Sequence, residues 1–376
     1  MKEIIKEFSV TLNDSLINDF RDVVNDEGFA YHYFANKDGR NQFNPICSCM
    51  DWITVAVRSI SNFPELSEDI DVKAMQVYSL ISSIDIVTEA VGQLHRIIMN
   101  DPKRKDKWPF KDSTHIFVEK SSYLSDRNDD DYFKEIRAIF GAHPTKLEKG
   151  SERMFASWPH YHAFNENDFT VSIYSNKPES DNIIFGIKIK ELLEYLKERY
   201  EYLSVLGKVL QDLKKKHYKM LSKRPIPPTD NIKDELRVLL SEVEVRGNND
   251  YYRMELGDLK HMFEGDVKEP HLMDETRAFK DMLYPAVAEI RTNLQKMKLV
   301  DLTAKGKVMF SGLPGYNLGY ELQKIFTWLH SDRYDPLSNY YLERLNKFSD
   351  GRYCFNAVDS DSTTLLKIHM MLYRYQ

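Results

Sequence analysis

The sequence predicts a mainly helical protein, in which a helical bundle with a small β-hairpin is followed by a second, mostly helical domain. Three observations lead to this prediction. Long stretches carry apolar residues at helical spacing, one short stretch alternates apolar and polar residues, and a proline-rich segment divides the chain. With 376 residues, the chain is long enough for two domains of ordinary size.

The composition is that of a folded globular protein, with 42% hydrophobic and 29% charged residues, and it excludes a bundle of membrane helices. No segment reaches the ~18 consecutive apolar residues that span a bilayer, and the N-terminal residues lack a secretory pattern. We therefore expect a cytoplasmic protein without membrane contact. The three cysteines, Cys47, Cys49 and Cys354, do not have the spacing of zinc ligands, so we predict neither a metal site nor a cofactor.

Two helices are predicted in the first part of the chain. Apolar residues recur at helical spacing from Ile46 to Ile60, after a polar loop over residues 36–45. A broader apolar pattern from Asp69 to Met99 indicates a helix in the middle of a bundle. Asp85 and Glu89 lie on that helix, four residues apart. We interpret them as an exposed flank, with an acidic pair near an active site as the alternative.

A third helix is predicted to carry Arg137. Apolar residues recur at helical spacing from Tyr132 to Phe140, and the acidic residues 129–131 favour a helix start. Gly141 and Pro144 favour a helix end, which leaves His143 just beyond it. Six residues along a continuous helix span about 600° of rotation, so Arg137 and His143 would lie on different faces. Only a turn after Phe140 brings their side chains together.

The motif Arg137-Ala-Ile-Phe-Gly-Ala-His143, followed by Pro144 and preceded by a long helical region, resembles that of the HEPN superfamily of all-α ribonucleases and nucleotide-binding proteins. The resemblance covers roughly residues 45–222. It implies metal-independent RNA cleavage by the RNA's own 2′-hydroxyl, in a toxin or defence role. In that reaction His143 takes up the hydroxyl proton or protonates the leaving oxygen, and Arg137 stabilises charge on the phosphorus centre. The resemblance further implies a homodimer in which two such helices form one composite cleft.

A basic loop over residues 100–107 supplies candidate substrate-binding residues, Lys103, Arg104 and Lys105. It is followed by aromatic residues, among them Trp108 and Phe110, and basic residues beside aromatics can hold phosphates and stack bases. A solvated loop whose aromatics pack into the core is the alternative interpretation.

The period of the apolar pattern changes after this motif. Residues 168–174 alternate in polarity and residues 183–189 form a second candidate strand, so a β-hairpin is predicted near residues 168–190, with RMFASW as a candidate third strand. One long helix is predicted from Lys190 to Ser222. It ends in KKKHYKMLSKR, the strongest basic cluster, whose cations either form a binding patch or complement the helix C-terminus.

The proline-rich residues 225–231 are predicted to form a linker between a domain of residues 1–224 and a domain of residues 232–376. In the second domain, helices are predicted over residues 232–246, 274–299 and 317–330, with a terminal helix near the end of the chain.

Three functions follow from these observations. The first is an endoribonuclease of HEPN type that acts on RNA. The second is an inactive HEPN-like binding or scaffold protein whose second domain engages a protein partner. Ala138 favours it, because the family usually has a polar residue after the arginine, and so does the net charge of −6, which gives no global attraction to RNA. The third is a different all-α protein in which Arg137 and His143 only cap a helix.

Overall fold

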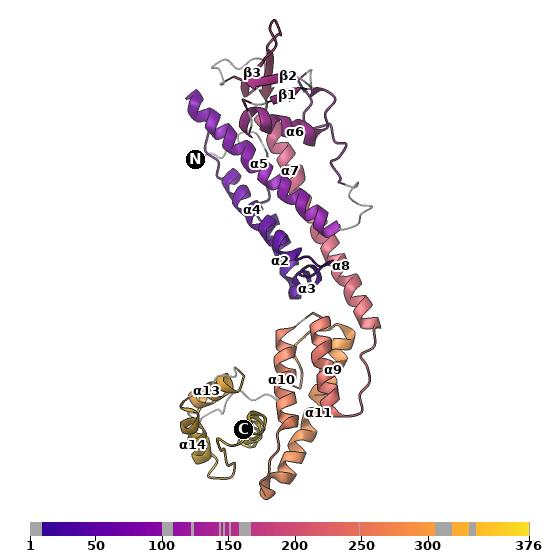
Figure 1. Cartoon of the computed structure of the whole chain (residues 1–376), viewed down its shortest axis with the longest axis vertical. Coiled ribbons are helices and arrows are strands. Elements are labelled where there is room, and N and C mark those ends of the chain that lie inside the picture. The colour runs from indigo at the N-terminus through magenta and orange to yellow at the C-terminus, as the bar shows by residue number, and fades with distance from the viewer. Residues whose placement is uncertain are drawn as a thin grey trace. The chain divides into compact units, whose positions relative to one another are not determined.

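The structure, a computed structural model, describes residues 10–99, 108–121, 124–142, 144–145, 147–149, 152–157, 167–247, 249–304, 318–330 and 336–375. The chain folds into two compact units, residues 1–214 and 215–376 (Figure 1). Both units are mainly helical, and the first also carries a small antiparallel sheet. The predicted fold class is therefore confirmed.

The first unit is built around one long central helix, α5, which packs against α4, α6 and α7. Its buried residues recur along most of its length, from Ala74 to Ile98, as expected of a helix in the middle of a bundle. The helices of this unit are α2 (Leu16–Asn25), α3 (Phe29–Phe34), α4 (Phe43–Ser61), α5 (Ile70–Met99), α6 (Asp129–Arg137), α7 (Ile189–Glu201) and α8 (Leu203–Lys223), the last of which continues into the second unit.

Helix α4 begins earlier than predicted. The side chain of Asn41 accepts hydrogen bonds from the backbone N–H groups of Phe43 and Asn44 and so satisfies two donors of the first turn. Pro45 lies within this first turn, where a missing N–H is tolerated. The proline therefore marks the start of the helix rather than the end of the loop.

The long helix predicted from Lys190 to Ser222 is helical along its length but is interrupted at one residue, Tyr202, which separates α7 from α8 and keeps a right-handed helical backbone. The Tyr202 hydroxyl lies 3.0 Å from Nδ1 of His95 on α5. Its ring also makes edge contacts with Trp108 and Phe110. The interruption thus lies where Tyr202 packs against α5 and the aromatic residues after it, contacts that a hydrophobic pattern does not contain.

The sheet has four antiparallel strands in the order β1-β2-β3-β4, namely β1 (Leu147–Lys149), β2 (Glu152–Ala156), β3 (Phe169–Ser175) and β4 (Ile183–Ile187). The predicted hairpin corresponds to β3 and β4, in which Val171 pairs with Phe185, and the candidate third strand corresponds to β2. Strand β1 was not predicted. Phe140 contacts the rings of Phe169 and Phe185, which joins the sheet to the segment after α6.

The second unit surrounds the C-terminal helix, which is buried from Thr363 to Leu372 and contacts α10 and α11. The predicted helices over residues 232–246, 274–299 and 317–330 and the terminal helix are confirmed, whereas α10 and α14 were not predicted. The helices are α9 (Ile232–Val245), α10 (Asp250–Glu264), α11 (Met273–Lys296), α13 (Gly319–Leu329), α14 (Ser338–Phe348) and α15 (Asp361–Arg374).

The proline-rich segment over residues 225–231 belongs to this second compact unit and packs against α11. Ile226 is buried, and its N–H donates to the side chain of Gln295 over 2.9 Å. Arg291 donates to the carbonyl groups of Ile226 and Pro227. The segment is thus anchored along its course.

The ammonium group of Lys367 lies in the interior of the second unit. It donates to Glu269 over 2.5 Å, to Asp359 over 3.0 Å and to the carbonyl of Cys354 over 2.8 Å. Three acceptors match its three donors, as a buried cation requires. This network ties α15 to two loops that precede it in the chain.

None of the helices in the described part of the chain has the length and apolar character needed to cross a bilayer.

Candidate functional site

Arg137 is the last residue of α6. The helix begins after Asn128, whose side chain accepts from the N–H of Asp131 over 2.8 Å, and acidic residues fill its first turn. This confirms the predicted amphipathic helix around Arg137. His143 lies outside the described residues, and so do Lys103, Arg104 and Lys105.

Immediately after Arg137 the α-helix changes into a π-helical turn over residues Ala138–Ala142. Such a turn is wider than an α-helical one and often occurs at functional sites. At Gly141, a Cβ atom would lie 3.0 Å from two ring atoms of Tyr78 on α5. Glycine thus permits the close approach of this turn to the central helix. A helix-ending turn was predicted after Phe140, whereas the α-helix ends at Arg137 and a π-helix continues through Ala142.

Arg137 forms an ion pair with Asp85 of α5, in which Nη1 donates to Oδ2 over 2.7 Å. The Arg137 side chain is 39% exposed and that of Asp85 is 23% exposed. The interpretation of Asp85 as part of an exposed flank is therefore wrong, whereas Glu89 is exposed as expected. Sequence spacing could not separate the two carboxylates, because only the packing of α6 against α5 covers one of them.

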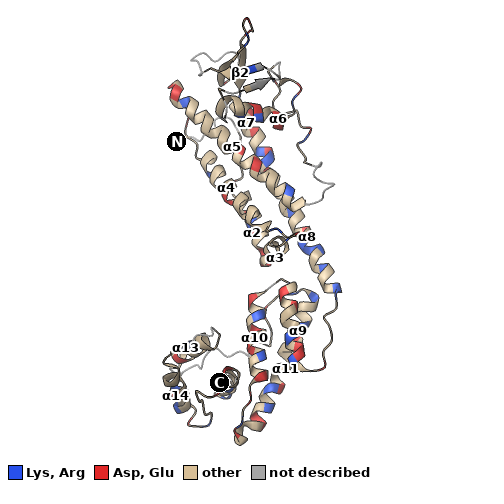
Figure 2. Ribbon diagram, in the orientation of Figure 1, with Lys and Arg blue, Asp and Glu red and all other residues tan. Residues whose placement is uncertain are grey.

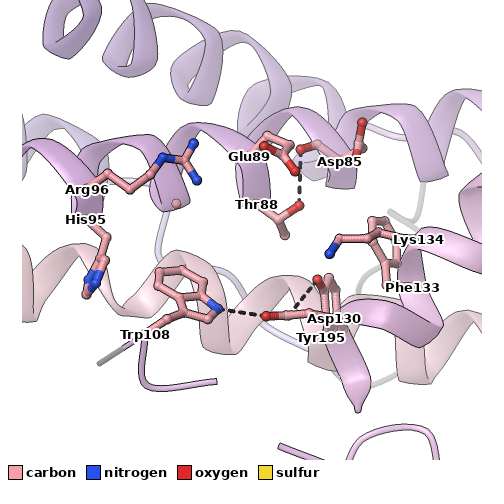
Figure 3. Close-up of a pocket in the computed structure, with 11 residues that line it drawn as sticks. Asp85, Thr88, Glu89, His95, Arg96, Trp108, Asp130, Phe133, Lys134 and Tyr195 are labelled. Carbon is pink, nitrogen blue, oxygen red and sulfur yellow. Dashed lines mark hydrogen bonds between the residues drawn. The ribbon is translucent and has the colours of Figure 1, made fainter. Parts of the chain in front are cut away.

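A pocket of about 470 Å³ opens beside this ion pair, between α5, α6 and α7 (Figure 3). Asp85 belongs both to the pocket wall and to the ion pair with Arg137. The residues that line the pocket are Asp85, Thr88, Glu89, Gly92, His95, Arg96, Trp108, Asp130, Phe133, Lys134 and Tyr195.

Asp130 organises one wall of the pocket. It accepts hydrogen bonds from the indole N–H of Trp108 over 2.7 Å and from the Tyr195 hydroxyl over 2.9 Å (Figure 3). Arg199, whose side chain is fully buried, also donates to it from Nη2 over 2.9 Å. Burial and the charge of Asp130 raise the pKa of Tyr195 well above its ordinary value. The Tyr195 hydroxyl therefore stays protonated and donates its hydrogen bond to Asp130.

The guanidinium group of Arg199 is held between aromatic rings, 3.9 Å from the centroid of Tyr195 and 4.4 Å from that of Phe110. Cation–π contacts and the ion pair with Asp130 together satisfy this buried charge. Trp108 and Phe110 therefore pack around α7, as in the alternative interpretation of the aromatic residues after the basic loop.

The opposite wall carries groups that are accessible for binding. Glu89 and Arg96 extend from α5, and Lys134 extends from α6 (Figure 3). Lys134 pairs with Asp131 at the surface, over 3.0 Å. The pocket thus combines cations, carboxylates and aromatic rings, which suits a polar aromatic ligand with an anionic group.

The basic cluster on α8 is partly neutralised. Figure 2 shows lysines along this helix, of which Lys214 pairs with Asp26 over 2.5 Å and with Glu27 over 2.9 Å. Near the end of the cluster, Arg224 pairs with Glu242 over 2.7 Å. In the described part of the chain, no three His, Cys, Asp or Glu side chains gather as ligands for a metal ion.

Comparison of the chain with protein-family models, with curated proteins and with solved structures gives no match. The described residues define a mainly helical protein of two compact units, with a polar pocket beside an Arg–Asp ion pair. The likeness to the HEPN superfamily therefore depends on the motif around Arg137 alone.

Proposed function

We propose that the protein is a metal-independent endoribonuclease of HEPN type, with Arg137 and His143 as its catalytic residues. One observation carries this proposal: Arg137 is held by Asp85 at the end of α6, next to a pocket with aromatic and hydrogen-bonding walls. A base of the RNA would occupy the pocket while the neighbouring phosphate meets Arg137. The pocket volume of about 470 Å³ is within the range of small-molecule sites.

The proposed reaction needs no external nucleophile. The 2′-oxygen of the RNA attacks the adjacent phosphorus, the bond to the 5′-oxygen breaks, and the products carry a 2′,3′-cyclic phosphate and a 5′-hydroxyl. His143 takes the proton from the 2′-hydroxyl or gives one to the leaving oxygen, since histidine titrates near neutral pH. Arg137 stabilises the negative charge that develops on the phosphate oxygens.

The test is cleavage of a mixed-sequence RNA by the purified full chain in the presence of EDTA. We expect products with cyclic phosphate ends, and we expect His143→Ala to abolish their formation. The surface variant Arg277→Gln in the second unit serves as the control for handling and folding, since the ion pair of Arg277 among the described residues is an exposed one with Asp274 at 3.7 Å. Cleavage that requires a divalent metal, or that survives His143→Ala, would refute this mechanism.

The proposal includes a homodimer, because the family resemblance implies a cleft formed by two copies of the helix that bears Arg137. Light scattering at micromolar concentration measures this directly. We expect twice the chain mass of 44.2 kDa. A mass of 44.2 kDa under these conditions contradicts the composite cleft but not the pocket itself.

An inactive binding or scaffold protein is the second candidate, and three observations favour it. Asp85 already compensates the charge of Arg137, and Ala138 follows this arginine. In addition, α13 and α14 present two largely exposed tyrosines, Tyr320 and Tyr340, which both contact Tyr341. Exposed aromatic residues are typical of protein interfaces. Absence of cleavage both by the natural chain and by Ala138→Glu would support this second candidate.

A further inference from the structure

A second pocket, of about 510 Å³, lies in the second unit and is independent of the proposed nuclease site. Residues of α11 and α15 form its apolar walls, chiefly Phe279, Met282, Met370 and Tyr373. Phe279 and Met370 are buried in the core, and Tyr373 is partly exposed at the opening. The pocket therefore has a fixed apolar base and an accessible edge.

Two guanidinium groups line the same pocket, those of Arg352 and Arg374. Both lie near Glu275: Nη2 of Arg352 is 2.7 Å from its carboxylate, and Nη1 of Arg374 is 3.7 Å from it. The Tyr353 hydroxyl also donates to Glu275. Burial opposes the ionisation of Glu275, but the hydrogen bonds from Tyr353 and Arg352 outweigh it and hold its pKa below the ordinary value.

One carboxylate thus faces two permanent cations, which leaves one positive charge uncompensated among the described residues that line the pocket. The contact of Arg374 is too long for a hydrogen bond, and its side chain is 46% exposed. The Nε atom of Arg352 is buried and has no hydrogen-bond partner among the described residues. A buried donor without an acceptor is uncommon and costs free energy.

We propose that this pocket binds a small organic carboxylate with an apolar body. The ligand carboxylate would accept hydrogen bonds from the exposed guanidinium group of Arg374, beside the ion pair of Arg352 with Glu275. Its hydrocarbon part would lie against Phe279 and Met282, where burial of apolar surface adds affinity. The pair of guanidinium groups selects for the anion, and the apolar walls select against small inorganic ions.

Calorimetric titration of the full chain with octanoate tests this proposal, with acetate, 1-octanol and inorganic phosphate as comparison probes. We expect saturable binding of octanoate in the millimolar range or tighter. Arg374→Gln should weaken it by about tenfold, since it removes a charge-assisted hydrogen bond. The matched control is Arg277→Gln, another exposed arginine of the same unit, which does not line the pocket and should leave octanoate binding unchanged.

A second variant tests the location without removing a cation. Ala278 lines the pocket at an exposed position of α11, so Ala278→Glu should fold and should repel the octanoate carboxylate. Loss of octanoate binding in this variant supports the proposal. Binding that is not saturable, or that is equally weakened by Arg374→Gln and Arg277→Gln, overturns it. Equal affinity for acetate or phosphate overturns the role of the apolar walls.

Discussion

Arg137 and Asp85 form an ion pair of 2.7 Å that joins the end of α6 to the middle of α5. The two residues are 52 positions apart in the sequence. The contact fixes the guanidinium group at the end of α6, where the α-helix changes into the π-helical segment. Asp85 therefore acts as a positioning residue if Arg137 is catalytic.

Replacing Asp85 with asparagine should lower kcat for RNA cleavage by roughly tenfold without raising KM. The variant keeps the size of the side chain but loses the charge that orients Arg137. The guanidinium group of Arg137 would remain available to bind a phosphate of the RNA, so the affinity for the RNA substrate should persist. Stabilisation of the transition state should fall, because the guanidinium group is no longer held in position. Steady-state kinetics with a short RNA separates the two parameters.

Glu89→Gln is the matched control, because Glu89 lies one turn further along α5 and lines the same pocket without pairing with Arg137. It should leave kcat within about twofold of the natural chain. If Asp85→Asn and Glu89→Gln change kcat equally, then kcat depends on the total charge of the pocket and not on the orientation of Arg137 by Asp85.

Replacing Asp130 with alanine should destabilise the first unit by about 3–5 kcal/mol. The change leaves the buried guanidinium of Arg199 with the longer 3.4 Å contact to Glu198 in place of its 2.9 Å partner, and it also removes the acceptor of Trp108 and Tyr195. Urea denaturation followed by tryptophan fluorescence measures the loss. The neighbouring Asp131→Ala removes an exposed pair with Lys134 and should cost less than about 1 kcal/mol. Similar losses in both variants would show that the buried network contributes little.

Gly141→Ala should lower the free energy of unfolding by about 1 kcal/mol, because the added Cβ meets the ring of Tyr78 at 3.0 Å. In a chain that also carries Tyr78→Ala, the same substitution should cost almost nothing, and a double-mutant cycle measures this coupling. Gly92→Ala on α5 is the control, since its Cβ would meet only the end of Arg96 at 3.8 Å. Equal costs for Gly141→Ala with and without Tyr78 would contradict the close packing.

Two histidines of the second unit, His330 and His369, should make the free energy of unfolding change with pH in opposite directions. Nδ1 of His330 lies 2.7 Å from the carbonyl of Phe326, which can only accept, and Nε2 lies 2.5 Å from Asp258. The hydrogen bond to Asp258 raises the pKa of His330, against the effect of burial. The protonated form is thus favoured in the folded state. Protonation of His330 therefore stabilises the folded protein fully at a pH below the pKa that this histidine has in the unfolded chain. The stabilisation disappears as the pH rises through the higher pKa of the folded protein.

His369 behaves in the opposite way. Both of its ring nitrogens are buried without hydrogen-bond partners among the described residues, and burial lowers its pKa to about 4. The unfolded chain takes up this proton near pH 6.5, so stability falls as the pH drops from about 6.5 to about 4. The full effect is on the order of 3 kcal/mol.

Urea denaturation at a series of pH values distinguishes the two residues. His369→Leu should remove much of the loss of stability on acidification between about pH 6.5 and about pH 4. His330→Gln should instead destabilise the protein more at about pH 6 than at about pH 9, because protonated His330 stabilises the folded state only at the lower pH. A His369→Leu variant with the same acid sensitivity as the natural chain would refute the effect of its burial.

The sequence alone predicts helices whose apolar stripes are regular, such as α5, and it predicts the hairpin of β3 and β4 by its twofold alternation. It fails where tertiary contacts override a local pattern. The interruption at Tyr202 lies in contact with His95 and Trp108, which precede it by more than 90 residues and so do not enter a local pattern. Helix α10 was missed because buried polar residues, Glu255 and Asp258, interrupt its apolar stripe.

The candidate site was predictable only in part. The helix of Arg137 follows from local periodicity, but the π-helix over Ala138–Ala142, in place of the turn predicted from Gly141 and Pro144, did not. The partner Asp85 did not follow, since a carboxylate on a helix flank shows its role only when another helix packs against it. Whether His143 approaches Arg137 remains a prediction.

The buried ammonium of Lys367 has an evolutionary consequence. A homologue that exchanged this lysine for an apolar residue would retain two partly buried carboxylates, those of Glu269 and Asp359, without the cation that they share. Their repulsion and lost hydration make such an intermediate costly, by several kcal/mol on general grounds. The three positions are therefore expected to change together or not at all during divergence, so correlated substitution at these sites offers a marker by which distant relatives of this chain can be recognised.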